Sequence, residues 1–155
     1  MRDTLTLRAL AAALLLALAG PALADAHGGK AERSLVIVTS DSLETQTMGM
    51  ILANTMQEQG TDLHVLLCDA AGELGIDGYS SDEGVTTPEG HPQDEVRPEA
   101  LLGGLIEGGA TVEVCAIFLP NRAHDEGDLR DGVGVAEPGP IAEMMRDPAI
   151  PAHSF

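Results

Sequence analysis

The sequence contains very few aromatic residues. It has no tryptophan, one tyrosine (Tyr79) and two phenylalanines (Phe118 and Phe155). The core must therefore be built from aliphatic side chains. Proteins that hold bases or sugars by stacking use several aromatic rings, and this chain has too few to form such a platform.

Basic residues are also scarce. The 155 residues include 8 Lys and Arg against 25 Asp and Glu, which gives a formal net charge of -17. A surface this acidic repels phosphate groups, so we exclude nucleic acid as a partner. General disorder is excluded as well, because 44% of the residues are hydrophobic and they gather in runs.

Several sequence motifs are absent. Two cysteines are too few for a small scaffold that depends on many disulfides. The dinucleotide motif G-x-G-x-x-G and the phosphate-binding P-loop do not occur, and neither does the hydrolase motif G-x-S-x-G. The sequence therefore predicts no nucleotide or flavin cofactor. A chain of this length predicts one domain.

The N-terminal residues have the pattern of a secretory signal peptide. Arg2 and Arg8 precede an uninterrupted run of Ala and Leu over residues 9–19, and the A-x-A cleavage site ends at Ala24. The alternative is a membrane anchor, but the apolar run is short for spanning a bilayer. We predict a cleaved signal peptide over residues 1–24, a periplasmic or secreted location, and no membrane contact after cleavage.

The rest of the chain alternates between strand-like and helix-like segments. After a flexible lead-in over residues 25–33, a domain is predicted over residues 34–155. The predicted strands cover residues 34–39, 63–68, 110–119, 133–135 and 149–155. Three helices are predicted: one that follows Ser42 and ends at Gly60, one that begins at Pro98, and one over residues 140–146.

This alternation predicts an α/β fold of one domain. We expect a three-layer, flavodoxin-like sandwich around a mainly parallel sheet of four or five strands. The strand at residues 34–39 is expected between those at 63–68 and 110–119. The acidic stretch at residues 69–96 is rich in Gly and Pro, and we expect a long functional or mobile loop there.

The two cysteines lie where α/β sheets place their sites. Cys68 ends one predicted strand and Cys115 lies in the second half of another, both near the carboxyl edge of the sheet. With one strand between them, the cysteines would be separated by roughly 9.5 Å. Because bridged Cα atoms are usually within about 7 Å, we predict two separate thiols. Each is either a reactive group or a buried, inert side chain.

Metal binding has little support in the sequence. The five histidines form no close ligand pair with each other or with a cysteine. A soft metal such as copper bound through Cys68 and Cys115, with Met48 or Met50, is one alternative. The methionines recur at helical spacing, which is more typical of a helix core. We therefore predict no resident metal.

Two segments resemble a known family. Residues 34–69 contain a strand, a helix ending near Gly60 and a second apolar strand; the second segment runs from Gly109 through Cys115 to Arg122. This order, with the G-x-x-x-x-x-C strand and a downstream arginine, resembles the DsrE/DsrF/TusD family of small sulfur-relay proteins. Phe155 matches the usual end of the family chain.

The resemblance implies a flavodoxin-like fold, an oligomer, and a cysteine that carries sulfur as a persulfide. That role falls on Cys115. The resemblance assigns no role to Cys68, which we take as an auxiliary or second thiol. Family members act in the cytoplasm, whereas this chain is predicted to be exported. A relay cysteine must react as a thiolate; a nearby arginine favours that form and carboxylates oppose it. The residues predicted to line the site are Ser40, Asp41, Ser42, Asn121 and Arg122.

Three functions remain open on the sequence. The first is a periplasmic sulfur carrier or sulfurtransferase that uses Cys115 and exchanges sulfur with a thiol-bearing donor or acceptor protein. The second is a non-catalytic, homo-oligomeric binding or assembly module of the same fold. The third is a soft-metal binder that uses Cys68 and Cys115. The sequence predicts an enzyme only in the first case, and there without a cofactor.

The charge generates a prediction about stability. Loss of residues 1–24 removes two arginines and one aspartate, so the exported chain is one unit more negative. Because salt screens repulsion between surface charges, we expect the melting temperature to rise between low salt and about 1 M salt, where the Debye length is roughly 3 Å. Thermal melts at the two concentrations test this. An unchanged or lower melting temperature would indicate an ordinary acidic protein without adaptation to salt.

Overall fold

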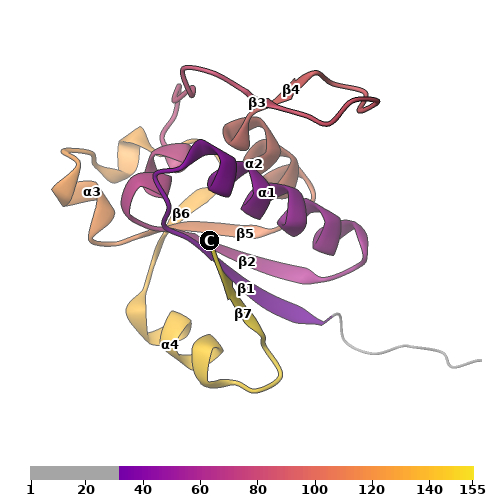
Figure 1. The fold of residues 1–155 in the computed structure, drawn as a ribbon. Helices are drawn as coiled ribbons and strands as arrows, with labels where there is room; N and C mark the ends of the chain where they lie inside the picture. Colours follow the sequence, from indigo (N-terminus) through magenta and orange to yellow (C-terminus); the bar gives the residue numbers. More distant parts are fainter. Residues whose placement is uncertain (1–31) are drawn as a thin grey trace, which may run out of the picture.

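A five-stranded sheet, parallel throughout, forms the centre of the computed structural model, which describes residues 32–155 (Figure 1). The predicted signal peptide and nearly all of the lead-in lie outside the described residues. The α/β fold class and the mainly parallel sheet are confirmed. The sheet has the order β6-β5-β2-β1-β7, with β1 (Arg33–Val38), β2 (Asp62–Leu67), β5 (Thr111–Cys115), β6 (Val133–Ala136) and β7 (Ala152–Ser154).

Helices cover both faces of this sheet. In Figure 1, α1 (Leu43–Glu58) and α2 (Pro98–Glu107) lie on one face and α4 (Pro138–Arg146) lies on the other. Among residues 32–155, no helix combines the length and the apolar character needed to cross a membrane. The smaller elements are the 3-10 helices η1 (Asp69–Gly75) and η2 (Glu126–Asp128), the short helix α3 (Phe118–Asn121), and a two-stranded antiparallel sheet of β3 (Val85–Thr86) and β4 (Glu95–Val96).

The two faces have separate aliphatic cores. Because side chains alternate along a strand, Val36 and Val38 of β1 pack into the core on the α1 and α2 side. Leu35 of β1 and Leu66 of β2 pack on the α4 side, against Ile141. Each strand of the centre is thus buried on both faces, which explains its continuous apolar run.

The predicted order of the strands is wrong. The strand at residues 34–39 was expected at the centre, but β2 occupies that place, between β1 and β5. The reason lies in the side of the sheet that each connecting helix covers. Right-handed crossovers on the same face move the chain in the same direction across the sheet. Since α1 and α2 share a face, β1, β2 and β5 follow one another, and α4 on the opposite face returns the chain to place β7 beside β1.

Contacts between α1 and α2 hold both helices on one face. The Asn54 side-chain amide donates to the Leu101 carbonyl at 3.0 Å, and that of Gln57 donates to the Leu105 carbonyl at 3.1 Å. Leu105 is fully buried in the core that α1 also covers. Each of these contacts depends on one polar side chain, so the spacing of hydrophobic residues along the helices does not predict it.

Two predicted segments differ from the structure. The loop at residues 69–96 contains η1 and the strands β3 and β4, because Ala71 and Leu74 are fully buried and anchor its start. Its middle is held by Glu99, whose carboxylate accepts hydrogen bonds from the Ser81 backbone N–H at 3.1 Å and from the Ser81 hydroxyl at 3.0 and 3.1 Å. The strand predicted at residues 110–119 ends at Cys115, and the chain then turns into α3.

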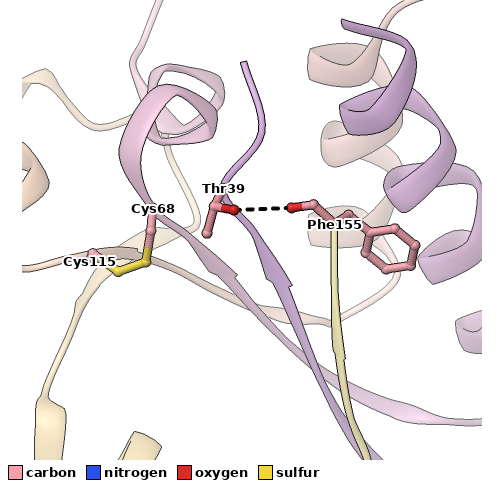
Figure 2. The surroundings of a disulfide bond; sticks show 4 residues. All are labelled: Thr39, Cys68, Cys115 and Phe155. Atoms are coloured by element: carbon pink, nitrogen blue, oxygen red, sulfur yellow. Dashed lines mark hydrogen bonds between the residues drawn. A yellow bond between two sulfur atoms is a disulfide. The ribbon is translucent and has the colours of Figure 1, made fainter. Parts of the chain in front are cut away.

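The predicted C-terminal edge strand is confirmed as β7, parallel to β1. The carbonyl oxygen of Phe155 accepts hydrogen bonds from the Thr39 backbone N–H at 2.9 Å and from its hydroxyl at 3.3 Å (Figure 2). The Phe155 ring lies over Gly49 of α1, where a Cβ atom would come within 3.1 Å of it. The end of the chain thus closes the sheet edge beside the carboxyl end of β1.

Candidate functional site

The two cysteines of the chain form a disulfide at the carboxyl edge of the sheet. Cys68 follows the last residue of β2, and Cys115 is the last residue of β5. Figure 2 shows the bond joining the ends of these neighbouring strands, with Thr39 after the end of β1 close by. The expected position of both cysteines at this edge is therefore confirmed.

The prediction of two separate thiols is wrong. It assumed that β1 lies between the cysteines, whereas β2 and β5 are direct neighbours. Their register pairs Leu67 with Val114, so the residues that follow lie side by side, with 5.1 Å between the Cα atoms of Cys68 and Cys115. Residues 40–42 follow β1, and β2 lies between β1 and the strand of Cys115.

Two hollows open on the cysteine pair. One, of about 420 Å³, is lined by both cysteines together with Asp69, Asn121 and Arg122. The other, of about 300 Å³, is almost entirely apolar, and among its lining residues are Cys115, Leu66, Ile117, Ala136, Ile141 and Met145. Cys115 therefore borders both hollows, whereas Cys68 borders only the first.

Arg122 is the cation of the first hollow. Its guanidinium donates to the Asp69 carboxylate at 2.9 Å; the Asp69 side chain is largely exposed, and that of Arg122 is 40% exposed. Asp69 has a positive φ of 50° directly after Cys68, a conformation that Asp and Asn tolerate better than most residues. The ion pair thus connects the residue after Cys68 with the segment that follows Cys115. Asn121 uses its side-chain amide locally, donating to the Ile117 carbonyl at 2.7 Å.

Further contacts attach the segment after β5 to η1. The ring of Phe118 covers Gly72, where a Cβ atom would overlap it. His124 stacks on Phe118 with 5.9 Å between ring centroids, and its Nε2 lies 3.4 Å from a carboxylate oxygen of Glu73. The two segments that leave the cysteine pair are therefore packed together as well as bonded.

The turn at residues 40–42 serves the start of α1 and does not line either hollow at the cysteine pair. The Ser42 hydroxyl accepts from the Thr45 N–H at 3.4 Å, and the Ser40 hydroxyl accepts from the Ser42 N–H at 3.0 Å. Asp41 lines a different hollow, which it shares with Arg122 and Tyr79. The pKa of Tyr79 is raised above its ordinary value, first by burial of the side chain and then by the negative charge of Glu99.

A metal site finds no support among residues 32–155. No group of three or more His, Cys, Asp or Glu side chains in this part of the chain is placed to hold a metal ion. Met50 is fully buried in the core beneath α1, and Met48 is exposed on that helix. Neither methionine lines the hollows at the cysteine pair.

Sequence reasoning missed the apolar half of the site. Ile141 and Met145 are spaced by four residues on α4 and line the second hollow, together with Ala136 at the end of β6. Helical spacing could have placed Ile141 and Met145 on one face of a helix. It could not have shown that this face lies beside Cys115, because that depends on the side of the sheet that α4 covers.

Comparison with known proteins identifies the fold. No family model matches the chain, and no curated protein matches it. Among solved structures, the ychN protein from E. coli is similar with a TM-score of 0.62 and 21% identity, over 79% of this chain and 99% of that one. MTH1491 from Methanobacterium thermoautotrophicum, a protein of unknown function, is similar with a TM-score of 0.56 and 14% identity, over 79% and 98%. The structural similarity establishes a DsrE/YchN-like fold. At these sequence identities it establishes nothing about activity.

The disulfide generates a prediction about stability. The cysteines are 47 residues apart, and a bond closing a loop of that length contributes up to about 4 kcal/mol in the chain-entropy model. Because the residues of the two aliphatic cores pack together without help from the bond, we expect the reduced protein to stay folded. Its free energy of unfolding should fall by no more than about 4 kcal/mol. Urea unfolding with and without dithiothreitol measures the difference.

The double variant Cys68→Ser/Cys115→Ser is the matched control, since its stability should not respond to the reductant. A reduced wild-type chain that is unfolded before any urea is added would contradict the prediction. That result would mean that the bond is required for folding.

Proposed function

We propose that this protein is an exported sulfur carrier of the DsrE type. In its reduced form, Cys115 takes the terminal sulfur atom of a sulfane-sulfur donor as a persulfide and transfers it to a thiol acceptor. Outside the cytoplasm the two cysteines rest as a disulfide. Reduction by an external dithiol therefore precedes loading.

The observation behind this proposal is the position of Cys115 between two hollows of different character. A carrier thiol must meet a donor and later an acceptor, and each exchange requires approach to the same sulfur atom. A purely structural disulfide needs no such openings. The half-buried Cys115 thus borders one hollow that contains charged side chains and one that is almost entirely apolar.

The hollow that contains Arg122 suits an anionic donor. Inorganic sulfane-sulfur donors such as polysulfide and thiosulfate are anions, and a chain with a net charge of -17 repels them. Arg122 provides positive charge inside the hollow, and its ion pair with Asp69 at 2.9 Å partly offsets that charge. Arg122 would also favour the thiolate form of a neighbouring cysteine.

The apolar hollow suits a protein acceptor. Ile117 and Met145 border it with 75% and 58% of their surface exposed, which is high for side chains of this size. A thiol-bearing partner could bury them while its own thiol approaches Cys115, since apolar contact areas of this kind stabilise complexes. The proposed partner is therefore a protein with an accessible cysteine in an apolar surface.

Mass spectrometry tests the loading step. The protein is reduced, freed of reductant without oxygen and mixed with polysulfide or thiosulfate. We expect Cys68→Ser to gain the mass of one sulfur atom on Cys115, and we expect no adduct in the matched variant Cys115→Ser. Native protein in which Cys115 stays unmodified until it unfolds would contradict the proposal and favour a binding module of the same fold.

Substitution of Arg122 tests the electrostatic role. We expect Arg122→Gln, in the Cys68→Ser background, to slow loading by roughly tenfold or more, because a charge-assisted hydrogen bond contributes about 1.5–3 kcal/mol. Arg146→Gln, at the end of α4, changes the net charge equally and should have little effect. Initial loading rates measured by mass spectrometry give the comparison.

Asp69→Asn separates the two tasks of Arg122. This variant removes the partner carboxylate of the ion pair but tolerates the positive φ at that position. If Arg122 acts on the anionic donor, Asp69→Asn loads at least as fast as its parent. Equal slowing in Arg122→Gln and Asp69→Asn would instead show that the ion pair only holds the loop in place.

A further inference from the structure

The cysteine pair has a second chemical property besides the capacity of Cys115 to carry sulfur. We propose that Cys68 is a resolving thiol, which attacks the persulfide on Cys115, closes the disulfide and releases the sulfane sulfur as sulfide. This inference rests on the proposed loading of Cys115. It makes the protein a reductant of sulfane sulfur in each cycle in which no acceptor takes the sulfur first.

The backbone holds the two cysteines together whether or not their sulfur atoms are bonded. β2 and β5 pair over four residues up to Leu67 and Val114. The Cys68 backbone N–H donates to the Val38 carbonyl at 2.9 Å, and Cys115 is paired with Ala136 of β6. The Cα separation of 5.1 Å is therefore a property of the sheet. In the reduced protein each thiol remains the nearest neighbour of the other.

This proximity determines what happens to a persulfide. Two reacting groups held in contact behave as if one were present at very high concentration. A persulfide on Cys115 therefore meets the Cys68 thiol before it meets an external thiol that is not docked beside it. A carrier that must hold its sulfur for long would not place a second thiol here, and the sequence has no other cysteine.

The hollows assign the two roles. Cys115 borders both openings and is the thiol that a donor can reach from either side. Cys68 borders only the hollow that it shares with Cys115. The cysteine that borders two hollows is loaded, and the one that borders a single hollow closes the bond.

The reaction is balanced without an added oxidant. The sulfur of Cys68 bonds to the γ-sulfur of Cys115, and the bond between that γ-sulfur and the terminal sulfur breaks. The terminal sulfur leaves with the electron pair as HS⁻, and the proton comes from the Cys68 thiol. Two thiol sulfurs are oxidised to the disulfide, while the sulfane sulfur is reduced to sulfide. An external dithiol then reduces the disulfide for another cycle.

A single-turnover experiment tests the inference. Reduced wild-type protein and Cys68→Ser are each mixed, without oxygen or reductant, with one equivalent of polysulfide per chain. We expect the wild type to end as the disulfide, two hydrogen atoms lighter than the reduced protein and without an added sulfur atom. We expect Cys68→Ser to keep the sulfur atom, and the wild type to release one more equivalent of sulfide than this variant.

Other outcomes separate this inference from the proposed function. If the wild type keeps the sulfur atom on Cys115 as Cys68→Ser does, Cys68 is not a resolving thiol and the carrier proposal stands. If neither protein gains sulfur or releases sulfide, loading itself fails and both proposals fall. If Cys115→Ser gains sulfur on Cys68, the assigned roles are wrong.

A time course on the wild type makes the test independent of variant folding. Acid-quenched samples of the wild type should show the sulfur adduct early and its conversion to the disulfide later, with sulfide release following the conversion. Disulfide that forms without sulfide release would overturn the inference.

Discussion

The parallel pairing of β2 with β5 is the interaction on which the rest of the site depends. It brings together Cys68 and Cys115, which lie 47 residues apart in the sequence, at 5.1 Å between Cα atoms. The pairing in turn depends on α1 and α2 covering the same face, because successive right-handed crossovers then move in one direction across the sheet. Hydrogen bonds from Asn54 and Gln57 to α2 carbonyls support that arrangement.

The chemistry of the site follows from its place at the carboxyl edge. The segments that leave β2 and β5 converge there, and each contributes one member of the Asp69–Arg122 ion pair. The same convergence forms the hollow that contains this ion pair on one side of Cys115, and residues of α4 line an apolar hollow on the other side. The proposed sulfur exchange uses both hollows: the one that contains Arg122 receives an anionic donor, and the apolar one receives a protein acceptor.

Local patterns predicted most of the elements. The runs at residues 34–39 and 63–68 form strands that end one residue earlier, and the first helix begins after Ser42, which caps its N-terminus. The alternation of strands and helices was enough to predict a parallel sheet. Strand order failed, because periodicity shows which face of a helix is apolar but does not show which face of the sheet it covers. The separation expected for the cysteines failed with it.

The sequence by itself determined the composition of the core, the parallel α/β class, and the position of both cysteines at the carboxyl edge, since these depend on residues close together in the chain. It also placed Arg122 after the strand of Cys115. Only the tertiary structure decided that the cysteines are neighbours, that Asp69 pairs with Arg122, and that α4 lines the second hollow. Those contacts join segments distant in the sequence, and the choice of sheet face that creates them depends on packing between helices.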